Sequence, residues 1–330
     1  EVRDHYFHLI QEVCETYDVD GVELDFLRHP CYFTPTLNGL PVEEQHLDIM
    51  TNFVCRIRKM AMNMGQRRGR PILLAVRTPF TLSDAQFIGL DLEKWLKTDL
   101  IDILIAGGLS ESPITDSFKQ IVDLGHQYNV PVYPCIKWGF WNYWAFLDLG
   151  SEKHRENGSW TKTLMSEEAR RRNIPPFNVT LIAWEGTLAT WRGAAMNLFN
   201  AGADGIYTFN AFFSNHDMWQ DIGDPKTMAG KDKIFGVDRF PGSSSFNGVN
   251  ELELNEGHPV IVVLQVGEDI KSAGPSVLRF RLHLWDLTEN DNISVKLNNE
   301  SLNDLKLIGP RQTPLKGYWL ECLLNPSHAK

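Results

Sequence analysis

The sequence has 330 residues, of which 43% are hydrophobic, 42 are acidic and 32 are basic, so its formal net charge is −10. That length suffices for one large hydrophobic core or for two domains. The acidic balance argues against a nucleic-acid partner or an anionic membrane surface, because both attract basic faces. No apolar run approaches the roughly 18 residues that a membrane-spanning helix needs, so no span is predicted.

Five cysteines are scattered along the chain without a CxxC pair or a metal-ligand spacing. A disulfide framework is not expected at this size, and no metal site or cofactor is predicted. The chain is rich in aromatic residues, with 10 Trp, 18 Phe and 8 Tyr. Such rings fill cores, and exposed rings also stack on sugar faces.

Helical and strand patterns alternate from the first residue onward. Apolar side chains recur at helical spacing over 2–17, and short apolar runs lie between Gly, Pro and polar residues. In chain order we predict a helix at 2–17, a strand at 19–26, a helix at 43–64 ending near Gly65, a strand at 71–79, a helix at 91–98, a strand at 100–108, a helix at 115–128 and a strand at 130–138.

A polar, tryptophan-rich stretch covers 139–190, followed by a helix with its turn over 189–205 and a last apolar strand, "GIYTFN", over 205–210. Apolar strands that alternate with helices indicate a parallel sheet covered on both faces. No glycine-rich phosphate-binding fingerprint follows any strand, which disfavours a doubly wound sheet. We therefore predict an α/β fold, a (β/α)8 TIM-barrel-like domain that lacks its first three strand–helix units.

From about residue 255 apolar and polar residues alternate with a period of two, in "HPVIVVLQVGEDI", "SVLRFRLHLWDL", "NISVKLNN", "LNDLKLIG" and "GYWLECLL". This pattern is typical of antiparallel strands and predicts an all-β sandwich. A Gly/Ser/Asn-rich stretch at 240–251 suits a linker. The predicted domains are a partial barrel over 1–250 and a β-sandwich over 251–330.

The most informative stretch is "DVDGVELDFLRHP", residues 18–30, where acidic residues interrupt an apolar strand. Alternation places Glu23 and Asp25 on one face, facing the barrel interior, while the apolar residues face the helices. Two carboxyls at the carboxyl end of a barrel strand are positioned for catalysis. Arg28 and His29 follow the strand and are candidates for binding a sugar hydroxyl. The alternative is a structural ion pair between these acids and Arg28 or Arg77, and Asp20 is expected to have a turn or capping role.

Three segments resemble one protein family. "YDVDGVELDFLRHP" resembles the fourth-strand signature of the barrel proteins called family ten glycosyl hydrolase-like, which are bacterial glycosidases. "AGADGIYTFN" resembles their last-strand signature, and "ISVKLNN…YWLECLLNP" resembles the β-domain that follows. The resemblance spans most of the chain and implies a glycosidase fold and reaction class, with a longer N-terminus than the one seen here.

Two wider resemblances bear on residue roles. "GVELDFLRH" is similar to the α-amylase strand that ends in the nucleophile, which implies that Asp25 is the nucleophile and that His29 binds sugar. "DGVELDF" is similar to the strand of family 18 chitinases, whose catalytic glutamate would fall on Leu27. Leucine cannot donate a proton, so a chitinase-type, substrate-assisted mechanism is not expected.

Most glycosidases use two carboxyls, one protonated and one ionised. With Asp25 as the ionised member, we predict Glu185 in "LIAWEGTLATW" as the acid, because the adjacent Trp184 would desolvate it and raise its pKa. Glu23 is the rival, and Glu111 is a third option. Further candidates for substrate binding lie at or beyond strand ends: Arg77, Lys137, Trp138, Trp141, Asn210 and His216. His216 and Asp217 lack a third metal ligand at a recognisable spacing.

The predicted function is thus a glycoside hydrolase that acts on a poly- or oligosaccharide by paired-carboxylate catalysis. A catalytically silent glycan-binding barrel is the main alternative, and a metal-dependent barrel hydrolase of the amidohydrolase type is the third. The expected partner is a carbohydrate substrate, the expected location is secreted or periplasmic, and the oligomeric state is not predicted.

Overall fold

A computed structural model describes residues 1–27, 30–107, 115–137, 179–209, 216–236, 254, 257–270, 277–284, 287, 291–308 and 318–324. For residues 115–117, 137, 179–187, 190, 216–217 and 283 it describes the backbone alone. The chain divides into two compact units, one of residues 1–140 with 194–227 and the other of residues 141–193 with 228–330.

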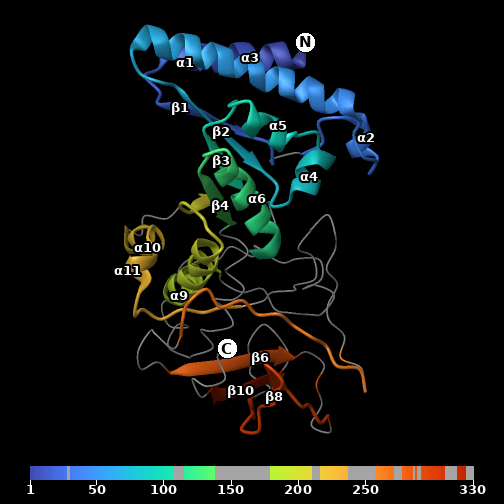
Figure 1. Ribbon diagram of the computed structural model, residues 1–330. Coiled ribbons are helices and arrows are strands. Elements are labelled where there is room, and N and C mark those ends of the chain that lie inside the picture. The colour runs from blue at the N-terminus through green and yellow to red at the C-terminus, as the bar shows by residue number, and fades with distance from the viewer. Residues whose placement is uncertain are drawn as a thin grey trace. The chain divides into compact units, whose positions relative to one another are not determined.

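The first unit contains a five-stranded parallel sheet (Figure 1). The strands are β1 (Gly21–Asp25), β2 (Leu73–Thr78), β3 (Ile103–Ala106), β4 (Val132–Lys137) and β5 (Tyr207–Phe209). They neighbour one another in chain order, β1-β2-β3-β4-β5, and every pair is parallel. A doubly wound sheet reverses its strand order, whereas a barrel adds strands in one direction. The predicted α/β class is confirmed, and the strand order is that of a partial barrel.

The sheet is strongly curved. Neighbouring strands lie about 4.8 Å apart, so a flat sheet of five would separate its edge strands by roughly 19 Å, with their side chains pointing the same way. In the structure the Tyr207 hydroxyl on β5 donates a hydrogen bond of 3.1 Å to Glu23 Oε1 on β1. Side chains of the two edge strands can meet only if the sheet curls, as the strands of a barrel do.

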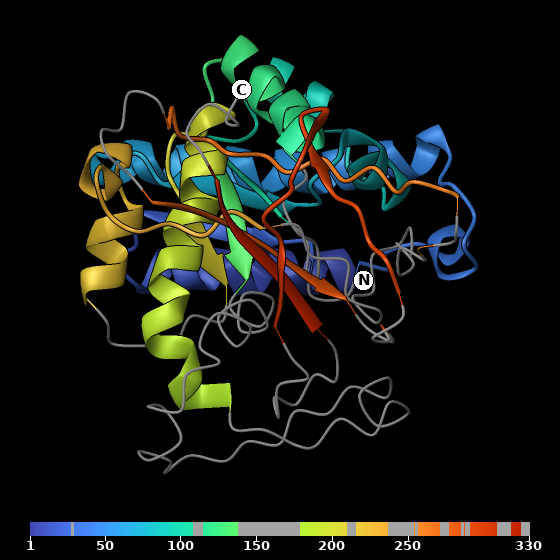
Figure 2. The same ribbon diagram turned by 90° about the horizontal axis from the view of Figure 1, so that it is seen from below.

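Helices of this unit are α1 (Val2–Thr16), α2 (Thr34–Leu37), α3 (Glu44–Arg68), α4 (Leu82–Phe87), α5 (Leu92–Lys97), α6 (Thr115–Gln127) and α10 (His216–Ile222). The dark-blue α1 and the lighter-blue α3 lie side by side in both views (Figures 1 and 2). Cys14, Ala61 and Ile72 form a buried cluster there, which joins α1 and α3 to the segment that enters β2. The helix α6 contacts β3 and β4.

The end of α3 differs from the prediction by one helical turn. We expected Gly65 to end the helix, but Gly65 is buried within it, and a Cβ there would lie 3.0 Å from the Arg70 carbonyl oxygen. Gly69 ends the helix instead, with a left-handed φ of 74°. The two glycines therefore serve different needs, close packing at Gly65 and a left-handed C-cap at Gly69.

Two further helices involve the second unit. The helix α9 (Val179–Asn200) crosses the limit between the units, as does α11 (Pro225–Met228). We expected the first of these helices to begin at residue 189, so it begins ten residues earlier than predicted.

The second unit contains antiparallel strands, as predicted. The strands β6 (Leu278–Leu284), β10 (Tyr318–Leu324) and β9 (Lys306–Ile308) form one sheet in that order. A tight hairpin joins β7 (Lys296–Leu297) to β8 (Glu300–Ser301), and its turn residues Asn298 and Asn299 have φ of 49° and 70°. The segment 258–270, predicted to form a strand, has a single bridge residue at His258 and no strand, and Ile261 within it is 84% exposed. The domain limits at 250 and 251 remain a prediction.

Candidate functional site

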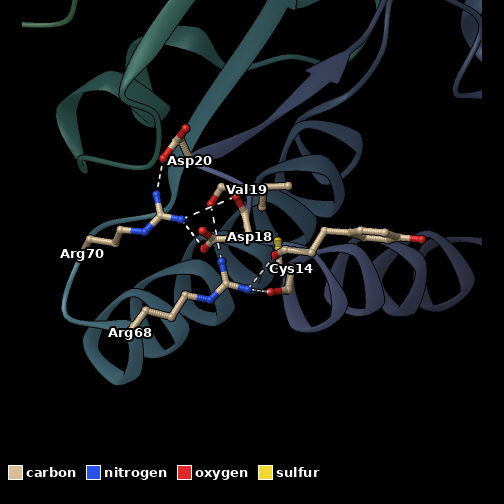
Figure 3. Close-up of polar contacts among 7 residues, drawn as sticks. Cys14, Asp18, Val19, Asp20, Arg68 and Arg70 are labelled. Atoms are coloured by element: carbon tan, nitrogen blue, oxygen red, sulfur yellow. Dashed lines mark hydrogen bonds and ion pairs between the residues drawn. The ribbon is translucent and has the colours of Figure 1, made fainter.

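The amino-terminal end of β1 is held by arginines that follow α3 or lie in its last turn (Figure 3). Arg70 forms ion pairs with Asp18 and Asp20. Arg68 donates to backbone carbonyls in the last turn of α1 and in the segment that joins α1 to β1. Asp20 therefore joins two segments at the end of the strand remote from the carboxyl ends of the sheet. We expected a turn or capping role for Asp20, whereas its side chain forms an ion pair with Arg70.

Along β1 the side chains alternate between two environments. Leu24 and Phe26 are 9% and 6% exposed, and Phe26 packs against Tyr32 and against Trp95 of α5. Glu23 and Asp25 lie on the other face, the concave face of the curved sheet. The density of acidic groups in this strand is tolerated because each face receives one kind of side chain.

Asp25 pairs with Arg77, its register partner on β2. The Nη1 atom of Arg77 donates to both carboxylate oxygens, at 3.1 Å and 2.9 Å, and the Leu27 backbone N–H donates to Asp25 Oδ1 at 2.9 Å. The carboxylate is thus held in one orientation by two neighbouring segments, while 32% of its side chain stays exposed.

Arg77 itself is fully buried, at 0% exposure. Its guanidinium carbon lies 4.1 Å from the centre of the Phe209 ring and 5.9 Å from that of Tyr207, both on β5. Its Nε and Nη2 atoms have no hydrogen-bond partner among the residues that the structure describes. We predicted that Arg77 binds substrate, but this burial leaves the guanidinium no exposed surface for a sugar hydroxyl. Arg77 influences the concave face through its ion pair with Asp25.

Glu23 receives the Tyr207 hydroxyl at 3.1 Å. The pKa of Glu23 is raised, chiefly because the carboxyl is partly buried. The hydrogen bond from Tyr207 and the charge of Arg77 lower this pKa, while the charge of Asp25 raises it further. Burial also raises the pKa of Tyr207 far above its ordinary value, so the phenol stays protonated and remains a donor.

Cys135 of β4 completes this group. It is the register partner of Tyr207 and is 2% exposed. Burial raises the pKa of Cys135 to about 11, although Arg77 opposes the shift. A thiol with that pKa is protonated at neutral pH and is a poor nucleophile. Among the described side chains of this group, the two carboxyls are therefore the candidates for acid–base chemistry.

Most of the other predicted site residues lie outside what the structure describes. Arg28, His29, Trp138, Trp141 and Asn210 are not described, and neither is the alternative acid Glu111. Lys137 ends β4 and His216 begins α10, but only their backbones are described. Their roles in substrate binding stay predictions.

Glu185 differs from its predicted setting. We expected it in a long loop after β4, but it lies within the helix α9 and in the second compact unit. The segment from Val179 onward is largely apolar and helical, so residues that we expected in the loop belong to the helix. The side chain of Glu185 is outside the described residues.

Leu27 occupies the position that carries the acid in the family 18 resemblance. Its side chain is 4% exposed and belongs to the core. No carboxyl can therefore stand two residues beyond Asp25, and the only glutamate on the described part of β1 is Glu23.

The sequence did not point to Tyr207, Phe209 or Cys135. The available signal was alternation: in "GIYTFN" the two aromatic residues are two apart and so share a face. We had chosen Asn210 at the strand end instead. A tyrosine in a short apolar strand has a polar tip that needs a partner, and here the partner comes from the opposite edge of the sheet.

In the described part of the chain, no cluster of three or more His, Cys, Asp or Glu side chains could hold a metal ion. No helix of that part combines the length and the apolar character needed to cross a membrane.

No protein-family model matches the sequence, and no curated protein matches it. Among solved structures, the chain is similar to a glycoside hydrolase family 18 N-acetylglucosaminidase from Paenibacillus barengoltzii, with 18% sequence identity and a TM-score of 0.30. The similarity covers 41% of this chain and 44% of that one, so it spans less than half of either protein.

Proposed function

We propose that this protein is a glycoside hydrolase of the barrel type, in which Glu23 is the general acid and Asp25 the ionised partner. The observation that carries the proposal is the unequal setting of two carboxyls on one face of β1. Glu23 has a raised pKa beside Tyr207, whereas the guanidinium of Arg77 balances the charge of Asp25. Glycosidic bond cleavage commonly uses a pair of carboxyls, one protonated and one ionised.

The spacing of the two acids bears on the stereochemical course. Side chains two residues apart on a strand stand roughly 7 Å apart. Carboxyls about 6.5–9.5 Å apart leave room for a water molecule, which is the arrangement of inverting enzymes. We expect inversion if Glu23 and Asp25 are the catalytic pair. If Glu185 supplies the acid, as first predicted, this spacing does not apply.

The proposal is tested by turnover of a panel of neutral oligosaccharides with the wild type, Glu23→Gln and Asp25→Asn. We expect each substitution to lower kcat by about 10²–10⁴-fold, because general acid–base catalysis contributes that much. Asp204→Asn is the matched control. Asp204 accepts the Val132 N–H at 2.7 Å and lies next to His126, at the amino-terminal end of β4. Wild-type turnover in both site variants would overturn the proposal, provided that circular dichroism shows all proteins folded.

A catalytically silent glycan-binding barrel is the second candidate, and two observations favour it. Leu27 stands where an acid is expected from the family 18 resemblance. Both oxygens of Asp25 already accept hydrogen bonds from Arg77, which suits a structural ion pair. Oligosaccharide binding by calorimetry, with no turnover in the wild type, would favour this function.

A further inference from the structure

Tyr207 and Glu23 come from opposite edges of the sheet, yet they form a hydrogen bond of 3.1 Å. The same strand β5 carries Phe209, which lies over the guanidinium of Arg77 at 4.1 Å. One edge strand therefore contacts both carboxyls of the concave face, Glu23 directly and Asp25 through Arg77. Among the described residues, Tyr207 is the donor to the Glu23 carboxyl, so the orientation of Glu23 depends on a partner across the sheet.

We propose that Tyr207 is a positioning residue, which fixes the orientation and the protonation state of Glu23 from across the concave face. As a statement about the acid of a glycosidase this rests on the proposed function, but the contact itself does not. A phenol that donates to a carboxylate favours the ionised form, so it keeps the proton of Glu23 from being held too tightly for transfer.

The groups that face Glu23 act in opposite directions. Among the described residues they are Asp25 on β1, Arg77 on β2, Cys135 on β4 and Tyr207 on β5. Burial and Asp25 raise the pKa of Glu23, while Tyr207 and Arg77 lower it, and the thiol of Cys135 is uncharged at neutral pH. Replacement of Tyr207 by Phe removes the polar atom that contacts Glu23 without changing a charge or the aromatic ring.

The test is a titration of the glutamate side-chain carboxyls by carbon-13 NMR in the full 330-residue chain. The signal of Glu23 is assigned by its loss in Glu23→Gln. Removing the hydroxyl in Tyr207→Phe takes away a donor to the ionised form, so we expect the titration midpoint of Glu23 to rise by about one pH unit. Tyr133→Phe on β4 is the control, since it removes a phenol hydroxyl and leaves the Tyr207–Glu23 contact in place.

Kinetics on the same variants separate positioning from a structural role. In Tyr207→Phe the basic limb of the kcat/KM profile should move to higher pH along with the NMR midpoint, and kcat should fall about tenfold because Glu23 loses its fixed orientation. KM should change little. A loss of stability alone would move neither the midpoint nor the basic limb.

The two proposals fail in different ways. A raised midpoint with no turnover in any protein would support the role of Tyr207 and overturn the proposed hydrolase. Turnover that depends on Glu23, together with an unchanged midpoint in Tyr207→Phe, would overturn the role of Tyr207 alone. An equal shift in Tyr133→Phe would also overturn it, because repacking rather than the hydrogen bond would then be the cause.

Discussion

Asp25 and Arg77 share one ion pair, but water reaches them unequally: 32% of the Asp25 side chain is exposed and none of the Arg77 side chain. Removal of Arg77 leaves a carboxylate that water can solvate. Removal of the charge of Asp25 leaves a guanidinium buried beneath Phe209, two of whose nitrogens have no partner in the described part of the chain. An unpaired buried charge is the costlier state.

We therefore expect Asp25→Asn to lower the free energy of unfolding by about 3 kcal/mol and Arg77→Met by about half as much. The double variant should be more stable than Asp25→Asn alone, since it removes both charges. Urea unfolding of the four proteins measures these differences. Equal costs for the two single variants would contradict the idea that unequal burial governs this pair.

Glu23 links the stability of the sheet to pH. Its pKa in the folded protein is raised, so between the unfolded and folded values the folded state binds more protons than the unfolded state. Stability from this group is therefore present at low pH and falls as the pH rises through that window. Glu23→Gln removes the titration, so the stability of this variant relative to the wild type should improve as the pH rises from the acid range toward neutral. Unfolding midpoints measured at a series of pH values test this, and a gap that is constant with pH would contradict it.

At this scale the sequence predicted which side chains of β1 face together, because alternation depends only on the backbone. It could not predict that Arg77 is buried, since burial of an arginine requires the rings of β5, a strand 130 residues further along the chain. The pairing of Asp25 with Arg77 was considered only as an alternative for the same reason.

Among the elements, α1 was predicted correctly as a helix, but the apolar residues that indicated it are not the ones that pack against the core. The apolar residues at helical spacing are the exposed ones: Val2 is 70% exposed, Tyr6 56% and Tyr17 61%. The face that packs against the core contains Ile10 and Cys14 instead. The sequence is apolar on both faces of this helix, so periodicity indicated the helix without indicating which stripe is buried.

A buried hydrogen bond joins α5 to α3. The indole N–H of Trp95 donates to the hydroxyl of Thr51 at 2.9 Å, and the two residues are 0% and 6% exposed. Thr51→Val keeps the shape of the side chain but leaves the indole N–H without a partner. We expect it to lower the free energy of unfolding by about 1–3 kcal/mol.

Thr51→Ser is the control for that contact, because it keeps the hydroxyl and removes only a methyl group. Its cost should be smaller, about 1 kcal/mol. Chemical denaturation of both variants makes the comparison. If Thr51→Val proves as stable as the wild type, the hydrogen bond contributes nothing net to the packing of these helices.

For the whole molecule, the alternation of apolar strands and helices predicted a parallel sheet, and the chain-order arrangement of its strands follows that prediction. The curvature was harder to predict, because it depends on how far the strands tilt and coil rather than on any local pattern. The antiparallel C-terminal sheet followed from period-two alternation, yet the run at 259–270 has the same period and forms no strand. Alternation shows that a segment suits a sheet, but it does not supply the neighbour with which the segment pairs.

Buried cysteines lie in both compact units, so their reactivity can follow the unfolding of each unit. Cys14 and Cys135 are buried in the first unit and Cys322 in the second, and burial raises the pKa of all three thiols. Cys31 is exposed and Cys55 is half-buried. In the native protein a thiol reagent should therefore modify Cys31 first and Cys55 more slowly, because thiolate character and access set the rate.

In increasing urea we expect Cys322 to become reactive before Cys14 and Cys135. The sheet around Cys322 has three described strands. In the same unit Ile261 is 84% and Val263 73% exposed, so unfolding there exposes little additional apolar surface. By contrast, Cys14 in α1 and Cys135 in the five-stranded sheet are 0% and 2% exposed, in the unit with the larger described sheet. Mass spectrometry of the labelled peptides at each urea concentration follows the sites separately. If all three thiols became reactive at one urea concentration, the two units would unfold as one cooperative whole, and the lower stability expected of the C-terminal unit would be refuted.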